Sequence, residues 1–172
     1  MKLDDDDFAL FGLQRRFTLD APQLDRRWRA LQAEVHPDRF AAQGTAAQRV
    51  AMQWAVRVNE AYRRLKDPLS RGAYLCELQG QAIAAERNTG MPAEFLHQQM
   101  SWRDALHEAA DDAEVRRLAG EVRQFEHSLL DGLQSLLDER GDYAAAAQQV
   151  RSLMFVRRFA QDVEERLEAL EQ

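Results

Sequence analysis

His36, Pro37 and Asp38 stand side by side, and this tripeptide is the feature of the sequence best suited to chemistry. Pro37 restricts its own backbone and disfavours helix at the residue before it, so the tripeptide predicts a turn between two helices. His36 and Asp38 are then short polar groups at a turn, where they can reach a partner. The alternative is a plain solvated turn. A fixed tripeptide occurs by chance in roughly one chain in a hundred of this length, so the tripeptide alone is only a moderate signal of function.

Side chains that could serve catalysis or metal binding are scattered along the sequence. The four histidines, His36, His97, His107 and His127, are scattered over several predicted elements, and each lacks a second ligand at metal spacing. The single cysteine, Cys76, excludes an internal disulfide and is predicted to be a buried structural thiol. The sequence also lacks a phosphate-binding glycine loop and a catalytic pair. It therefore predicts no enzyme activity, no metal site and no cofactor.

The helix before the tripeptide has a clear start and a clear end. Asp20 can cap it, with Gln23 as the reciprocal partner, and Pro22 suits its first turn. Pro37 ends it, because the residue before a proline disfavours the helical conformation. Its apolar residues follow spacings of four, three and four and form one narrow stripe: Leu24, Trp28, Leu31 and Val35.

Three arginines of this helix lie off the apolar stripe. Arg26 and Arg29 point away from it, and Arg27 lies on its flank. A basic face of this kind can give steering and register toward a protein partner. It can equally be a solvated helix face, and the residues themselves leave both interpretations open.

Further helices are predicted before and after the helix that Asp20 opens. Thr45 with Gln48 forms a capping-box pattern, and the helix that it opens runs to Asp67. A short helix then ends at Gly80, a typical stop residue. The run Asp4–Asp7 is interpreted mainly as a solvated tail that partly marks the start of a short first helix. The inner face of the helix after Thr45 is predicted to be Ala51, Ala55, Val58, Tyr62 and Leu65.

The second half of the sequence predicts a three-helix bundle. Pro92 opens one helix, the pair at Asp111 opens a second that ends at Gly141, and Asp142 starts a third. Short turns between three helices favour an antiparallel bundle. The whole chain is therefore predicted to be all-α, with three parts: a first domain at 1–80, a linker at 81–91 and the bundle at 92–172.

Charge and composition narrow the choice of partners. The 172 residues are 45% hydrophobic and 30% charged, which is typical of a globular protein. Residues 1–79 carry thirteen Lys and Arg against eleven Asp and Glu, whereas residues 80–172 carry ten against eighteen. The acidic second half argues against nucleic-acid binding. No apolar run has the length of a membrane span and no signal-peptide pattern is present, so a cytoplasmic protein without a membrane partner is predicted.

The surroundings of the tripeptide resemble a J domain. Arg39 and Phe40 follow it, and the stretch 58–68 (VNEAYRRLKDP) looks like the J-domain helix that packs antiparallel on the preceding one. Further segments resemble the HscB-type co-chaperones of iron–sulfur cluster assembly, which join an N-terminal J domain to a C-terminal bundle. These segments are residues 11–13, 17–20, 71–78, 95–96 and 103–106.

This resemblance implies a function in two parts. The first domain would dock on an acidic surface of a DnaK/HscA-type ATPase chaperone and trigger its ATP hydrolysis. The bundle would hold the iron–sulfur cluster scaffold protein, so that the chain delivers the scaffold to the chaperone. The residues implied at the chaperone contact are His36, Pro37, Asp38, Arg26, Arg27, Arg29 and Arg39.

Helical geometry marks a second candidate surface, on the bundle. Leu96 and Met100 lie about a third of a turn away from the inward stripe of their helix, and Phe155 lies similarly off the stripe of the last helix. They could form one exposed patch or belong to a broad packed arc. The inward stripes are predicted to be Phe95, Trp102, Leu106 and Ala109 in the first helix and Val156, Phe159, Val163, Leu167 and Leu170 in the last.

The family resemblance favours the patch and implies that it contacts the scaffold through Leu96, Met100, Asp104 and Phe155. His97 and Ser101 differ from the family, where an apolar and an acidic residue stand at these positions. Two other functions stay open: a J-domain co-chaperone with a different client, and a non-catalytic helical adaptor in which the tripeptide is a plain turn.

Overall fold

The computed structural model describes residues 5–83 and 92–170, and the described part of the chain consists of helices, turns and loops without a strand. By its internal contacts the chain divides into two compact units, Met1–Leu75 and Cys76–Gln172. None of the described helices has the length and apolar character needed to cross a bilayer. The all-α prediction is therefore confirmed.

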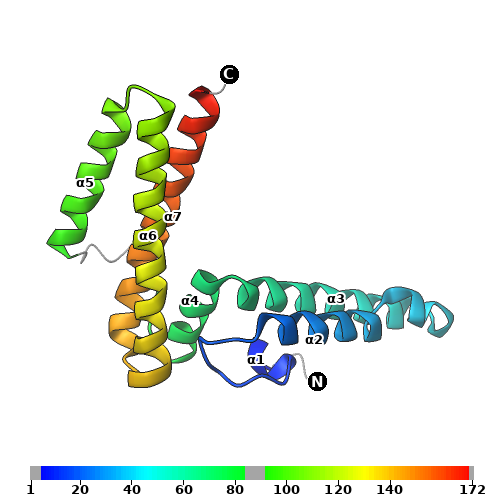
Figure 1. Ribbon diagram of the computed structural model, residues 1–172. Helices are drawn as coiled ribbons and strands as arrows, with labels where there is room; N and C mark the ends of the chain where they lie inside the picture. Colours follow the sequence, from blue (N-terminus) through cyan, green and yellow to red (C-terminus); the bar gives the residue numbers. More distant parts are fainter. Residues whose placement is uncertain (1–4, 84–91, 171–172) are drawn as a thin grey trace. The chain divides into compact units, whose positions relative to one another are not determined.

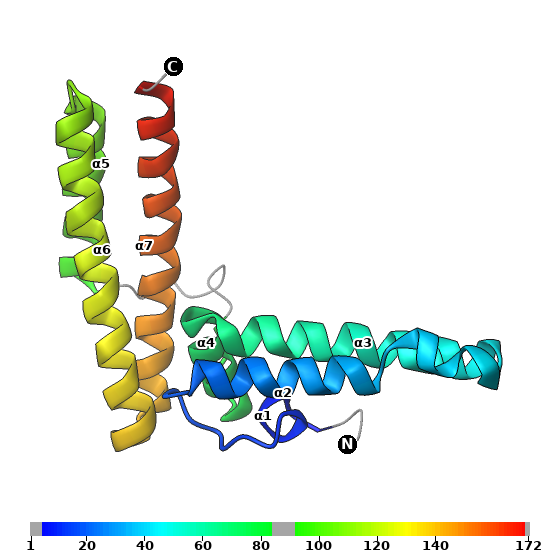
Figure 2. The same ribbon diagram turned by 45° about the vertical axis from the view of Figure 1, so that its right-hand side comes forward.

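The first unit is built on a pair of antiparallel helices that lie side by side (Figures 1 and 2). A short helix α1 packs against the pair, and a 3₁₀ helix η1 joins its two members. The helix α4 follows and crosses the division between the units. The bounds are α1 Asp7–Leu10, α2 Ala21–Glu34, η1 Pro37–Gln43, α3 Thr45–Lys66 and α4 Pro68–Leu78.

The start of α2 is the one that the sequence predicts. The Asp20 carboxylate accepts a hydrogen bond from the Gln23 N–H at 3.0 Å, which satisfies one of the free donors of the first turn. The predicted Thr45 cap is wrong, because Thr45 is already the first residue of α3 and Gly44 precedes it with φ +91°. That backbone conformation suits glycine, and it turns the chain into α3 without a side-chain cap.

Apolar side chains fill the space between α1, α2 and α3. Val35, directly before the tripeptide, is among them, so the end of α2 is anchored in the core. The Arg71 side chain is also buried and donates to the carbonyls of Phe17 and Leu65, at 2.8 and 2.6 Å. The buried apolar residues of this unit include Phe8, Leu10, Phe11, Phe17, Leu24, Val58, Ala61 and Leu65.

The second unit contains the predicted antiparallel bundle, in which α6 lies beside both α5 and α7 (Figure 2). Its aromatic centre is Trp102, which stacks on Phe159 at 5.7 Å and meets Phe125 edge-on at 5.1 Å. The Asp111 carboxylate caps α6 by accepting from the Glu114 N–H at 2.9 Å. The bounds are α5 Ala93–Glu108, α6 Asp112–Gln134, the π-helix η3 Ser135–Arg140 and α7 Tyr143–Leu170.

The expectation of an inward Leu170 is wrong, whereas Gly141 ends the second bundle helix as predicted, in the left-handed conformation. The last six residues of that helix form the π-helix η3. The wider turn of a π-helix shifts the inward positions, so Leu137 is buried and Leu136 is half-buried. Leu170 is 37% exposed, because it ends α7 beyond Leu167, which still packs on the core.

The division between the units lies inside α4, between Leu75 and Cys76. The predicted boundary at residue 80 stays a prediction, and most of the predicted linker, residues 84–91, lies outside the described residues. Cys76 is fully buried, as predicted for a structural thiol, and burial raises its pKa to about 11.

Candidate functional site

The tripeptide forms an exposed turn between α2 and η1. His36 is the N-cap of η1, and its Nδ1 accepts a hydrogen bond from the Asp38 N–H at 3.3 Å. The Asp38 carboxylate lies 3.6 Å from the same nitrogen, and the two side chains are 58% and 90% exposed. Because Nδ1 is the acceptor, the neutral ring carries its proton on Nε2. The turn therefore offers a partner one N–H donor and one carboxylate.

Arg39, directly after the tripeptide, closes the end of α2. Its Nη1 donates to the Ala33 carbonyl at 3.0 Å, which is one of the carbonyls left free at a helix C-terminus. The positive charge also lies at the negative end of the helix dipole. Arg39 thus has a positioning role at the turn, besides the chaperone contact that the resemblance implies.

Arg27 has a similar structural role at the other side of α2. Its Nη1 donates to the Phe11 carbonyl and, at 2.6 Å, to the Gly12 carbonyl. These two carbonyls follow the end of α1, so Arg27 fastens α1 to α2. Arg26 and Arg29, in contrast, are both exposed. The structure therefore separates the three predicted arginines into one that is bonded within the unit and two that are free to meet a partner.

A polar network that sequence reasoning missed joins α2 to α3. Asn59 Oδ1 accepts from Trp28 Nε1 at 3.0 Å and from Gln32 Nε2 at 2.9 Å. The Trp28 and Tyr62 rings stack at 4.4 Å. Trp28 and Gln32 are four residues apart on one helix, and Asn59 and Tyr62 are three apart on the other. Polar and aromatic residues three or four positions apart on each of two antiparallel helices are the sequence signal that could have predicted this contact.

Asp25 completes this network one turn before Trp28 on α2. Its Oδ1 accepts from the Tyr62 hydroxyl at 2.9 Å and from Lys66 Nζ at 2.6 Å. The hydrogen bonds from Lys66 and Tyr62 lower the pKa of Asp25, with a smaller contribution from the nearby charge of Arg29. The hydrogen bond between Lys66 and Asp25 also raises the pKa of Lys66. Both helices of the hairpin are therefore fixed in register below the exposed turn.

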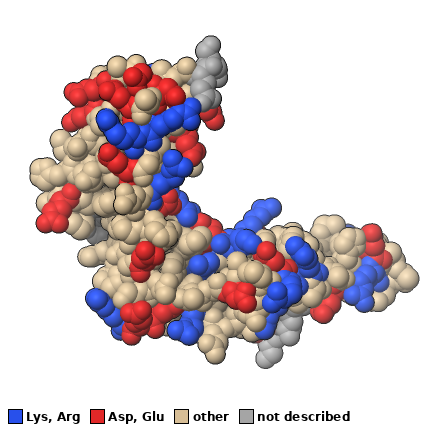
Figure 3. Space-filling model, viewed as in Figure 1, with Lys and Arg blue, Asp and Glu red and all other residues tan. Residues whose placement is uncertain are grey.

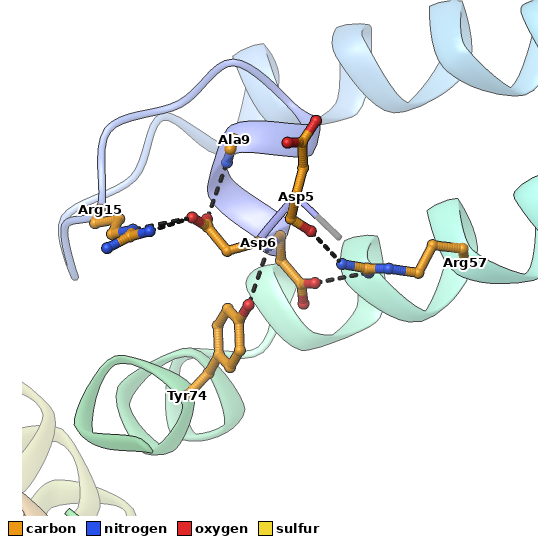
Figure 4. A network of polar contacts seen from close by, with 7 residues as sticks. Asp5, Asp6, Ala9, Arg15, Arg57 and Tyr74 are labelled. Carbon is orange, nitrogen blue, oxygen red and sulfur yellow. Dashed lines mark hydrogen bonds and ion pairs between the residues drawn. The ribbon is translucent and has the colours of Figure 1, made fainter. Parts of the chain in front are cut away.

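On the opposite side, a buried carboxylate anchors α1 to α3, next to the contacts of Arg57 and Tyr74 that Figure 4 labels. The Asp7 side chain is fully buried, with Arg64 Nη1 donating to it at 2.8 Å and Arg57 Nη1 at ion-pair distance, 2.7 Å. Its backbone N–H donates to the Tyr74 hydroxyl at 3.1 Å. The interpretation of Asp4–Asp7 as a solvated tail is therefore wrong for Asp7; Asp4 lies outside the described residues.

The bundle exposes the four residues of the predicted patch. Leu96 is 45%, Met100 63% and Phe155 39% exposed, and Asp104 is exposed as well. The packed-arc alternative is therefore wrong for the three apolar residues. His97 and Ser101 are also exposed on α5.

Helix geometry indicates that these apolar residues lie on one side of the bundle. A hollow between α5 and α6 is lined on α5 by Ala105 and Glu108, and a hollow between α6 and α7 is lined on α7 by Ala160 and Glu164. By the 3.6-residue period, Leu96 and Met100 lie on the opposite flank of α5, and Phe155 lies on the opposite flank of α7. Both flanks therefore face the side of the bundle on which α5 and α7 meet, as the Trp102–Phe159 stack shows.

Charge is distributed differently over the two units (Figure 3). On the visible face of the bundle, acidic side chains gather at the end where α5 meets α6 and α7 ends, an end that includes Glu108, Asp111 and Glu168. On the hairpin of the first unit, basic side chains are spread along both helices among single acidic ones. No group of three potential metal ligands occurs among the described residues.

Comparisons with known proteins agree on one family. The family model described as the HSCB C-terminal oligomerisation domain matches residues 91–164. The chain is 53% identical to the Co-chaperone protein HscB homolog of Bordetella petrii, over 92% of this chain and 94% of the relative. It is 47% identical to the Co-chaperone protein HscB homolog of Azoarcus sp., over 98% and 97%.

Solved structures share the fold. Chaperone HscB from Vibrio cholerae superposes with a TM-score of 0.83 at 35% identity, over 96% of this chain and 99% of that one. The human co-chaperone protein HscB gives a TM-score of 0.87 at 28% identity, over 98% and 83%. The Jac1 co-chaperone from Saccharomyces cerevisiae shows the same fold, with a TM-score of 0.76 at 21% identity, over 92% and 94%.

Proposed function

Since the chain belongs to the HscB family of co-chaperones, we propose that it stimulates the ATPase of a DnaK/HscA-type chaperone and delivers the iron–sulfur cluster scaffold protein to it. It is a co-chaperone of iron–sulfur cluster assembly and not an enzyme. The observation that carries the proposal is the exposed turn of His36, Pro37 and Asp38 between two helices that are fixed in register.

The chaperone contact is proposed to combine steering and triggering. Arg26 and Arg29 are exposed guanidinium groups on α2, suited to an acidic surface, where they would act mainly on association rate and orientation. His36 and Asp38 then present a donor and a carboxylate at the end of the same helix. Pro37 and the Arg39 bond to Ala33 hold that turn in place, so that binding through the arginines brings the turn to one site on the chaperone.

The scaffold contact is proposed on the side of the bundle where α5 and α7 meet. Leu96, Met100 and Phe155 give an apolar centre, and Asp104 adds a charge beside it. An apolar centre with a polar rim is the usual anatomy of a protein–protein interface. Together the two contacts would let one chain hold its client and signal to the chaperone.

Two titrations of the full chain test these contacts. Adding the chain to a DnaK/HscA-type chaperone should raise steady-state ATP turnover in a saturable way, and calorimetric titration should show binding of the scaffold protein. Binding of the scaffold without any ATPase stimulation would contradict the co-chaperone mechanism. Stimulation without scaffold binding would leave a J-domain co-chaperone with a different client.

Truncating the apolar centre is expected to weaken scaffold binding. Phe155→Ala should lower the affinity about 5- to 30-fold and Met100→Ala somewhat less, because large apolar side chains at the centre of an interface carry most of its binding energy. ATPase stimulation without scaffold should stay unchanged. The measurement is calorimetric titration with the scaffold protein.

Leu170→Ala is the matched control for this prediction. Leu170 lies on the same helix as Phe155 and is similarly exposed, at 37% against 39%, but it lies at the far end of α7. Its truncation should leave scaffold affinity as in the wild type. Equal losses from Leu170→Ala and Phe155→Ala would show that the predicted patch has no special part in binding.

A further inference from the structure

One side of the hairpin of α2 and α3 is covered by α1, and its arginines are already bonded. Arg27 of α2 donates to the Gly12 carbonyl, just beyond the end of α1. On α3, Arg57 and Arg64 both ion-pair with Asp7 of α1. A partner could use these guanidinium groups only by breaking bonds that hold the unit together. A basic docking surface therefore has to lie elsewhere on the hairpin.

The other side of the hairpin is identified by the polar network. Asp25 and Gln32, like Trp28 between them, reach across from α2 to α3 there. Arg29 follows Asp25 by four residues and precedes Gln32 by three, so it shares their side of the helix. The charge of Arg29 also contributes to the lowered pKa of Asp25, which agrees with this placement. Arg29 thus stands beside the network and is exposed.

The same relation holds for Arg63 on α3. Asn59 and Lys66 are network residues of α3. Arg63 follows Asn59 by four residues and precedes Lys66 by three, so it shares their side. Arg63 is exposed, and within the described part of the chain no hydrogen bond or ion pair engages its guanidinium group. The network side therefore carries a free arginine on each helix.

We propose that the chaperone-docking surface extends from α2 onto α3 through Arg63, and that it binds a carboxylate-rich surface of the ATPase chaperone. This inference rests on the proposed function. The Asn59 hydrogen bonds and the Trp28–Tyr62 stack fix the two helices relative to each other, so Arg29 and Arg63 are held at a set separation. Charges on one helix alone would let a partner pivot about that helix, whereas charges on two helices fix its orientation.

Arg63→Gln in the full chain tests this surface. The concentration of the variant that gives half-maximal ATPase stimulation should rise about two- to fivefold at low ionic strength, since an exposed ionic contact contributes modestly. The maximal stimulation should stay unchanged, because the tripeptide is intact. The difference from the wild type should shrink as added salt screens the charges, and Arg63→Lys should restore most of the affinity.

Arg16→Gln is the matched control. Arg16 is an exposed arginine of the same unit, but it lines a hollow beside Gln23 and Arg27, on the side of α1. Its loss removes the same charge and should leave half-maximal stimulation unchanged. If Arg63→Gln behaves as Arg16→Gln while the wild type stimulates, the inference is overturned and the proposed function stands. If the wild type gives no stimulation, both are overturned.

Discussion

Replacing His36 by glutamine is expected to abolish stimulation of the chaperone ATPase, with turnover falling to the basal rate and the fold intact. The imidazole lies at an exposed turn, held by one hydrogen bond from the Asp38 N–H. Glutamine has one more rotatable bond and no rigid ring, so it would not keep the donor and the Asp38 carboxylate in one arrangement. The loss of that capping bond should reduce the free energy of unfolding by only about 1 kcal/mol.

The readout for this variant is steady-state ATP turnover, with circular dichroism as the check of the fold. His127→Gln makes the same chemical change at another exposed histidine, whose side chain is 79% exposed on α6, and should stimulate like the wild type. Normal stimulation by the His36 variant would reduce the tripeptide to a turn and favour the adaptor interpretation.

Replacing Asp7 by asparagine is expected to destabilise the first unit strongly. The change removes the buried charge that pairs with Arg57 and Arg64 and leaves two guanidinium groups without their carboxylate. Breaking a buried pair typically costs 3–5 kcal/mol. Arg57 and Arg64 are 23% and 43% exposed and can partly turn to water, so a loss of about 2–4 kcal/mol is expected. Urea unfolding followed by circular dichroism measures it.

Asp6→Asn gives the comparison for that loss. Asp6 caps α1 through the Ala9 N–H and pairs with Arg15 at the surface. Burial alone would raise its pKa, but the bond from Ala9 and the contact with Arg15 hold the pKa below its usual value. Asparagine is an equally good cap, so only the surface pair is lost, at less than about 1 kcal/mol. Equal losses at both positions would contradict the anchoring role of Asp7.

Local signals predicted most of the fold correctly. Proline and capping residues mark the helix ends: Asp20 and Asp111 cap α2 and α6 as expected. The 3.6-residue period also displaced Leu96, Met100 and Phe155 from the core stripes of their helices, but it left an exposed patch and a broad packed arc both open. The family resemblance favoured the patch, and all three residues are exposed. The helix ends depend on residues within a few positions of one another, which is why the sequence alone reveals them.

Features that depend on distant contacts were missed. Asp7 looks like its neighbours in an acidic run, and it is buried because Arg57 and Arg64 meet it from α3. Arg27 was placed on the flank of the apolar stripe, but its bond to Gly12 follows only once the end of α1 lies next to it. The π-helix at the end of α6 likewise has no sequence signal in its leucine pattern. In each case the partner lies far away in the sequence, or the change is a shift in backbone hydrogen bonding.

In the proposed mechanism, one chain holds the scaffold and triggers the chaperone. This mechanism is tested by ATP turnover of the chaperone at a limiting scaffold concentration, with wild-type chain or with an equal mixture of the His36→Gln and Phe155→Ala variants. The wild type should stimulate more strongly with scaffold than without it. The mixture should lack this extra stimulation, because neither chain combines both contacts. Full extra stimulation by the mixture would contradict delivery by a single chain.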